Sequence, residues 1–136
     1  KPLPFASASF DIIVHPVSNC YIREVEPLWR ECFRVLKPGG VLLAGLDNGI
    51  NYIFDNEETE LKHSLPFDPL NDPALMEELQ KTDDGVQFSH TFEEQVGGQL
   101  KAGFVLTHLF EDVNGYGRLH EMNIPTFVAT RAVKPE

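Results

Sequence analysis

The chain has 136 residues, enough for one domain, and 42% of them are hydrophobic, enough to build a core. It carries 11 Lys and Arg against 21 Asp and Glu, a formal net charge of −10. This acidity argues against nucleic-acid binding and against binding to an anionic membrane surface, because both require a concentrated basic face. No apolar run approaches the roughly 18–20 residues that cross a bilayer.

The first predicted element is a strand. The run FDIIV begins at Phe10, ends at Val14 and is almost wholly apolar. Such a run is typical of a strand in the middle of a parallel sheet, covered by helices on both faces. A central strand needs a neighbour on each side, and the preceding residues supply none. We therefore expect the chain to be the second half of a larger domain, in which this strand has lost one neighbour.

A helix and a second strand are predicted next. The helix has apolar residues on one face at helical spacing: Val25, Leu28, Trp29, Cys32, Phe33 and Leu36. Pro27 falls in its first turn, and Pro-Gly-Gly at residues 38–40 ends it. VLLAGL at residues 41–46 is predicted to be another buried strand. Strand, helix and strand in this order indicate an α/β fold.

A long acidic segment follows. Residues 49–90 contain ten Asp and Glu but only two Lys, with one short helix predicted at residues 73–81. A connection of this length in a compact domain is usually a functional lid or a disordered tail, and its many apolar residues argue against pure disorder. The acidic run at residues 55–60 could recognise a cationic substrate, although a solvated charge run is the favoured interpretation.

The last part of the chain is predicted to be a helix and two strands. Thr91 followed by Glu94 is a capping-box pattern for a helix start. The buried face of this helix is expected to hold three residues: Phe92, Val96 and Leu100. Gly103 is the expected helix end, and residues 104–111 and 124–133 read as strands. Because no helix separates these strands, we expect them to be antiparallel.

Three stretches in fixed order resemble one family. LPFASASFDIIV, WRECFRVLKPGGVLLAG, and LKAGF followed by PTFVATRA are similar to segments of class I S-adenosylmethionine-dependent methyltransferases. The resemblance implies a sheet of order 3-2-1-4-5-7-6 with strand seven antiparallel, of which this chain supplies strands four to seven. It implies a partial methyltransferase domain over residues 1–136: a βαβ unit (1–48), an acidic insertion or cap (49–90), and a helix with a closing antiparallel hairpin (91–136). The glycine-rich loop and the ribose-binding acid of the family lie outside these segments.

The resemblance also implies cofactor-binding residues. Leu3, Pro4 and Phe5 correspond to the family's L-P-F, near the adenine of S-adenosylmethionine. His15 and Pro16 follow the first strand at its carboxyl end, where the chain lines the sulfonium and the substrate. Two alternatives stay open: Phe5 as a simple core contact, and His15 as a residue that contributes only its backbone. His15 as a general base is a third, less favoured role.

Substrate-binding candidates follow the same strands. Asn19 lies in the loop after the first strand, although a helix cap is the favoured role. Asp47 and Asn48 end the second strand and are expected to face the methyl acceptor, with a polar turn equally well supported. No catalytic residue can be assigned, since methyl transfer depends mainly on positioning. The histidines lack metal-ligand spacing, so no metal is expected.

Two functions of different classes fit these observations. The first is an enzyme: the intact protein transfers a methyl group from S-adenosylmethionine to a small-molecule acceptor, and this chain alone is inactive. The alternative is a non-catalytic methyltransferase-like module for binding or assembly. A nicotinamide-dependent oxidoreductase shares the architecture but not the pattern of LKPGG with a closing hairpin. The two cysteines suggest a cytoplasmic protein. The exposed strand from Phe10 to Val14 is expected to mediate self-association, as a dimer.

Overall fold

The sheet has four strands and is mixed. In the computed structural model, which describes residues 1–83 and 85–136, β1 (Phe10–Pro16) pairs in parallel with β2 (Leu36–Asp47). β4 (Pro125–Val133) lies antiparallel between β2 and β3 (Val105–Val113), so the order is β1-β2-β4-β3. The predicted α/β class, the parallel first pair and the antiparallel final pair are therefore confirmed.

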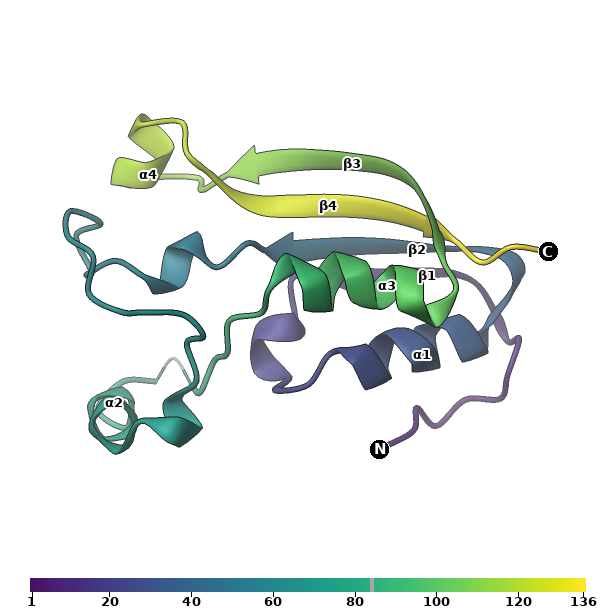
Figure 1. The fold of residues 1–136 in the computed structure, drawn as a ribbon, viewed down its shortest axis with the longest axis horizontal. Coiled ribbons are helices and arrows are strands. Elements are labelled where there is room, and N and C mark those ends of the chain that lie inside the picture. Colours follow the sequence, from purple (N-terminus) through teal and green to yellow (C-terminus); the bar gives the residue numbers. More distant parts are fainter. Residues whose placement is uncertain (84) are drawn as a thin grey trace.

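Helices cover one face of this sheet. Figure 1 shows α1 and α3 side by side on that face, with α2 beyond the carboxyl ends of β1 and β2. The helices are α1 (Glu26–Val35), α2 (Pro73–Leu79), α3 (Gly98–Ala102) and α4 (Arg118–Glu121), with a π-helical turn at Glu93–Gly97 and 3-10 turns at Asn19–Tyr21, Ile50–Tyr52 and Pro69–Asn71. No helix among these described elements is long and apolar enough to span a membrane.

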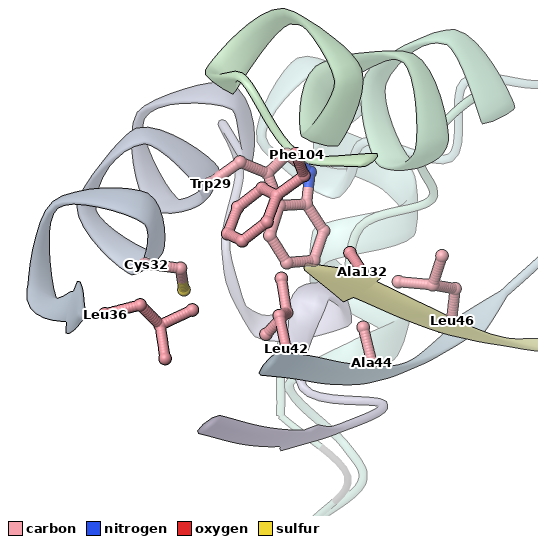
Figure 2. Packing of buried hydrophobic residues seen from close by; sticks show 8 residues of the cluster. All are labelled: Trp29, Cys32, Leu36, Leu42, Ala44, Leu46, Phe104 and Ala132. Atoms are coloured by element: carbon pink, nitrogen blue, oxygen red, sulfur yellow. The ribbon is translucent and has the colours of Figure 1, made fainter. Parts of the chain in front are cut away.

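The core lies between the two helices and β2. Trp29 and Cys32 point from α1 toward Leu42 on β2, and the Phe104 ring lies beside Trp29 in the same cluster (Figure 2). Trp29 and Leu42 are fully buried. The amphipathic face predicted for α1 is thus confirmed. The residues that the helical spacing identified are the ones whose burial stabilises the packing of α1 on the sheet.

The other face of the sheet is open. Val14 on β1 is 66% exposed and Phe110 on β3 is 64% exposed, and Ile12 and Leu43 are also exposed. β1 is an edge strand, with β2 as its neighbour in the sheet that the described residues form. β1 therefore carries apolar side chains on both of its faces, although helices cover only one face of the sheet.

β2 begins earlier than predicted. It starts at Leu36 rather than Val41, because Leu36 already pairs with Phe10 before the ladder breaks and resumes at Val41 with Ile12. The Pro-Gly-Gly segment forms this irregularity. Gly39 has a φ of +82°, and a Cβ on Gly40 would lie 2.8 Å from the carbonyl oxygen of Lys37, so both positions require glycine.

The helix after residue 90 differs most from its prediction. Thr91 does cap it, since the Glu94 amide donates to the Thr91 hydroxyl at 3.1 Å, and Gly103 ends it in the left-handed region. The predicted buried face is wrong for Phe92 and Leu100, which are exposed, whereas Val96 is partly buried and packs against the core as predicted. Two glutamines are buried instead: Gln95 and Gln99. The wide π-helical turn shifts the faces of the helix relative to a regular α-helix, and both amides find partners inside.

Smaller differences concern element ends. α2 ends at Leu79 rather than residue 81, and the last two strands are displaced by one or two residues. The segment with Gly115 and Gly117, read from the sequence as a loop, contains the short helix α4. Helix ends fray and are the least reliable part of a sequence pattern.

The close approach of α1 and α3 yields a test of packing. A Cβ on Gly98 would lie 2.7 Å from Cδ1 of Trp29, so Gly98→Ala must push the helices apart. We expect a loss of about 1–3 kcal/mol in the free energy of unfolding, measured by urea denaturation. Gly97→Ala is the matched control, because the nearest atom to its Cβ is 3.9 Å away. It should be neutral or stabilising by up to about 1 kcal/mol; equal losses in the two variants would contradict this account.

Candidate functional site

The carboxyl ends of β1 and β2 lie side by side. His15 pairs with Ala44 and Pro16 with Gly45, and Asp47 ends β2 just beyond. Open parallel sheets bind their ligands beyond the carboxyl ends of neighbouring strands. This end of the strand pair is therefore the candidate site, and it brings together four of the predicted residues: His15, Pro16, Asn19 and Asp47.

An apolar groove runs over the open face at this end. Its volume is about 600 Å³. It is lined by Val14, His15, Pro16 and Val17 from the end of β1, Leu43 to Gly45 from β2, His108 and Phe110 from β3, and Ala129 to Arg131 from β4. The predicted residues His15 and Pro16 thus border a groove large enough for a small organic molecule.

The imidazole of His15 is engaged with the protein. Its Nε2 lies 2.6 Å from Oδ1 of Asn19, and its ring meets the Trp29 ring edge-on at a centroid distance of 5.6 Å. The side chain is therefore directed toward the helical layer. The hydroxyl of Ser18 lies 3.3 Å from Nδ1. Asn19 is 2% exposed and is the first residue of the 3-10 turn, so the predicted role as a cap is wrong, and its side chain bonds to His15 and Gln95 instead.

Val17, directly after β1, has a strained backbone. Its φ is +54°, in the left-handed region that β-branched residues avoid. The turn is held by a hydrogen bond from the Val17 amide to the Gly45 carbonyl at 3.0 Å and by the Cys20 thiol on the Val17 carbonyl. Strain of this kind, of about 1–3 kcal/mol, persists where the surroundings impose it, and it is concentrated at functional sites.

Asp47 and Asn48 have different surroundings. The Asp47 carboxylate accepts hydrogen bonds from the Gly49 amide at 2.7 Å and from the Asn51 side chain at 2.9 Å, and burial raises its pKa. Asn48 instead donates to the Pro125 carbonyl at 2.8 Å and accepts from the Ile50 amide. The side chain of Asn48 thus joins the end of β2 to the start of β4.

The structure does not bring Leu3, Pro4 and Phe5 to this site. The Arg34 side chain binds the carbonyls of Leu3 and Phe5, and the Phe5 ring packs against Phe10 at a centroid distance of 5.0 Å. Phe10 begins β1 and Pro16 ends it, so the two predicted cofactor-binding groups lie at opposite ends of a seven-residue strand. Arg34 also holds the pKa of Glu31 down at about 2.

The long acidic segment folds back onto the site. The Phe88 amide donates to the Cys20 carbonyl at 2.7 Å, and the Tyr52 hydroxyl donates to Gln87 at 3.0 Å. His90 is buried, with its Nε2 at 2.9 Å from the Asn19 carbonyl and 2.6 Å from the Ile22 carbonyl. The contacts between these elements leave a space of only about 10 Å³ among them, which is too small for a ligand.

Several acidic side chains of this segment have structural partners. Asp55 accepts from the amides of Thr59 and Glu60, which lowers its pKa, and Glu58 accepts from the Leu119 amide of α4 at 2.7 Å. Part of the acidic run therefore closes turns and joins the acidic segment to α4.

Sequence reasoning missed the residue at the centre of the site. Gln95 is 1% exposed, and its amide nitrogen lies 2.7 Å from the Asp47 carbonyl, while its oxygen lies 3.2 Å from the Asn19 amide. A glutamine on an amphipathic helix reads as a surface residue, so periodicity gave no signal. Tyr52, in a 3-10 turn, and His90, outside any helix or strand, were missed because no regular pattern marks their burial. Burial raises the pKa of Tyr52 and of the Cys20 thiol. Among residues 1–83 and 85–136, no cluster of His, Cys, Asp and Glu could hold a metal ion.

Known proteins resemble this chain in sequence and in fold. A family model described as a methyltransferase domain matches residues 1–44. The protein YbaJ of Bacillus subtilis, described as an uncharacterized methyltransferase, is 39% identical over 137 aligned positions, which cover 96% of this chain and 53% of YbaJ. This chain thus spans about half the length of the curated relative it matches.

Solved structures agree in fold. An S-adenosylmethionine-dependent methyltransferase from Mesorhizobium loti superposes with a TM-score of 0.71 at 16% identity, over 96% of this chain and 64% of the other. A methyltransferase of the same class from Methanosarcina mazei has a TM-score of 0.60 at 19% identity, over 98% and 64%. The family model and the sequence relative show that this chain is similar to methyltransferases over part of their length, and the solved structures show that it shares the fold of part of an S-adenosylmethionine-dependent methyltransferase.

The surroundings of Asp47 predict a pH dependence. Because burial raises its pKa in the folded state, protonation of Asp47 favours folding, and its contribution to stability is lost as the pH rises through the folded pKa. Wild type should therefore gain stability relative to Asp47→Asn as the pH falls from 7 to 4. Urea denaturation of both proteins across this range measures the difference. A constant difference, or one that shrinks toward pH 4, would contradict the assigned cause.

Proposed function

We propose that the intact protein transfers a methyl group from S-adenosylmethionine to a small-molecule acceptor at the carboxyl ends of β1 and β2. The observation that carries the proposal is the groove of about 600 Å³ at this end of a sheet whose fold matches methyltransferases. In this proposal β1, β2, β4 and β3 are strands four, five, seven and six of the family sheet. Residues 1–48, 49–90 and 91–136 are then a βαβ unit, an acceptor-side cap, and a helix with the closing hairpin.

The residues at the groove fit part of such a cofactor. The main chain from His15 to Val17 borders the groove and is fixed by the Val17–Gly45 hydrogen bond, so it can line a ligand without moving. When bound, S-adenosylmethionine supplies an activated methyl group on a sulfonium. The protein's task is then to align donor and acceptor, and effects of up to about 7–11 kcal/mol come from such positioning.

Acceptor binding is proposed for Asp47, with lesser parts for Asn48 and for Asn19, whose side chain is 2% exposed and bonded to His15 and Gln95. Asp47 supports the assignment best, because it is a carboxylate at the strand end with a raised pKa. Asn48 supports it least, because its amide is already bound to Pro125 and Ile50. For Leu3, Pro4 and Phe5, cofactor binding would require a ligand that reaches along the outer side of β1 toward α1.

The proposed function is tested by calorimetric titration with S-adenosylhomocysteine. The titration compares this chain with one extended by about 100 residues at its amino end, roughly half a domain. We expect only the longer chain to bind, and this chain alone to show no transfer of methyl. Binding by the short chain would contradict the expectation that it lacks part of the cofactor site, and methyl transfer by the short chain would contradict its predicted inactivity. If neither chain binds, methyltransferase function is contradicted and a non-catalytic binding or assembly module becomes the better account.

Self-association is proposed through the strand that begins at Phe10 and ends at Val14. Ile12 and Val14 expose apolar surface on an edge strand, and edges of this kind pair with other chains. Sedimentation of this chain at tens of micromolar should show dimers or larger species, and Val14→Lys should shift them toward monomer. Leu61→Lys, at another exposed apolar residue, is the matched control and should change nothing. Sedimentation of the wild type as a monomer alone would contradict the proposal.

A further inference from the structure

We propose that Gln95 and Asn19 are positioning residues of the candidate site, which hold the His15 imidazole with Nε2 protonated and Nδ1 free to accept a hydrogen bond. The proposal deepens the proposed function, and its catalytic significance rests on it. Three side chains form a hydrogen-bonded relay: Gln95 from the π-helical turn Glu93–Gly97, Asn19 from the 3-10 turn after β1, and His15 from β1.

The orientation of the Gln95 amide is fixed by the main chain. Its Nε2 lies 2.7 Å from the carbonyl oxygen of Asp47 and 3.3 Å from that of His90. Main-chain carbonyls can only accept hydrogen bonds, so the atom facing them must be the NH₂ group. Oε1 of Gln95 therefore points the other way, toward Asn19, as an acceptor.

The orientation of the Gln95 amide fixes that of the Asn19 amide, which in turn fixes the protonation of His15. Because Gln95 offers an oxygen, Asn19 must turn its NH₂ group toward it, and the two atoms lie 3.2 Å apart. Oδ1 of Asn19 then faces Nε2 of His15 at 2.6 Å. An oxygen acceptor at this distance requires a proton on Nε2. The direction of every hydrogen bond thus follows from the Asp47 and His90 carbonyls.

The reverse arrangement is strongly unfavourable. A His15 that accepted at Nε2 would need the Asn19 amide flipped, and then the Gln95 amide flipped as well. Oε1 of Gln95 would then face two carbonyl oxygens in the interior, and each buried polar group left without a partner would lose its desolvation energy without compensation. The hydrogen bonds of the relay therefore run in one direction only, from Asn19 to Gln95 and from His15 to Asn19. In this arrangement Nδ1 of His15 carries no proton, and the Ser18 hydroxyl, 3.3 Å away, donates to it.

The relay also joins the parts of the site that a ligand would need in fixed positions. It connects the end of β1 through His15, the strained turn at Val17 through Asn19, and the end of β2 through the Asp47 carbonyl. Gln95 and Asn19 are both almost fully buried, and fully paired buried networks of this kind favour one arrangement over others. Gln99, four residues on, instead binds Thr130 and the Gln95 carbonyl.

The test is the tautomer of His15, read without any ligand. Long-range ¹H–¹⁵N NMR of this chain at pH about 8.5, above the ordinary range for imidazole, should show the proton on Nε2 and none on Nδ1. The signal is assigned by its loss in His15→Gln. A proton on Nδ1 overturns the proposal, and this wild-type measurement stands even where a variant fails to fold.

Matched variants test which residues act. Gln95→Leu should speed exchange of the His15 Nε2 proton with water at least tenfold. Gln99→Leu removes an equally buried glutamine that does not touch Asn19 or His15, and should change the exchange rate less than twofold. Equal effects in the two variants would show general loosening and overturn the positioning role. Since no cofactor takes part, failure here is distinct from failure of the methyltransferase proposal.

Discussion

The structure depends on how Trp29 joins α1 to the helix after residue 90. Its ring is fully buried, lies against Gly98, and meets His15 at its edge. Its Nε1 donates to the Glu94 carbonyl at 3.1 Å, inside the π-helical turn where regular helical bonding is interrupted. One side chain therefore provides core volume, fixes the spacing of two helices and supports the turn that directs Gln95 inward.

Buried apolar and buried polar side chains have different roles in this structure. Apolar side chains from α1 and β2 supply the stability of the helical layer, as hydrophobic burial does in most domains. At the carboxyl ends of the strands the interior is polar instead, with Asn19 and Gln95 bonded to each other and to main-chain groups. Net stabilisation from such bonds is modest, about 1 kcal/mol each, so their main effect is to specify geometry.

Local patterns predicted the fold well and the site only in part. Helical spacing identified Trp29 and Cys32 as core, and the order of elements gave the mixed sheet, because these features depend on neighbours in sequence. His15 and Asp47 were found because residues after parallel strands meet at one edge. Gln95 could not be found this way, since its burial depends on a π-helical turn and on partners 48 and 76 residues away in sequence. Phe92 and Leu100 were misassigned for the same reason.

The central claim is that the ligand binds where β1 and β2 end. Its most direct test is NMR shift mapping of the intact protein with S-adenosylhomocysteine. The account predicts that amide shifts change most from His15 to Cys20 and at Asp47, around the groove and the strained turn. Shifts confined to the acidic segment or to the β3–β4 hairpin, with the ends of β1 and β2 unaffected, would contradict it.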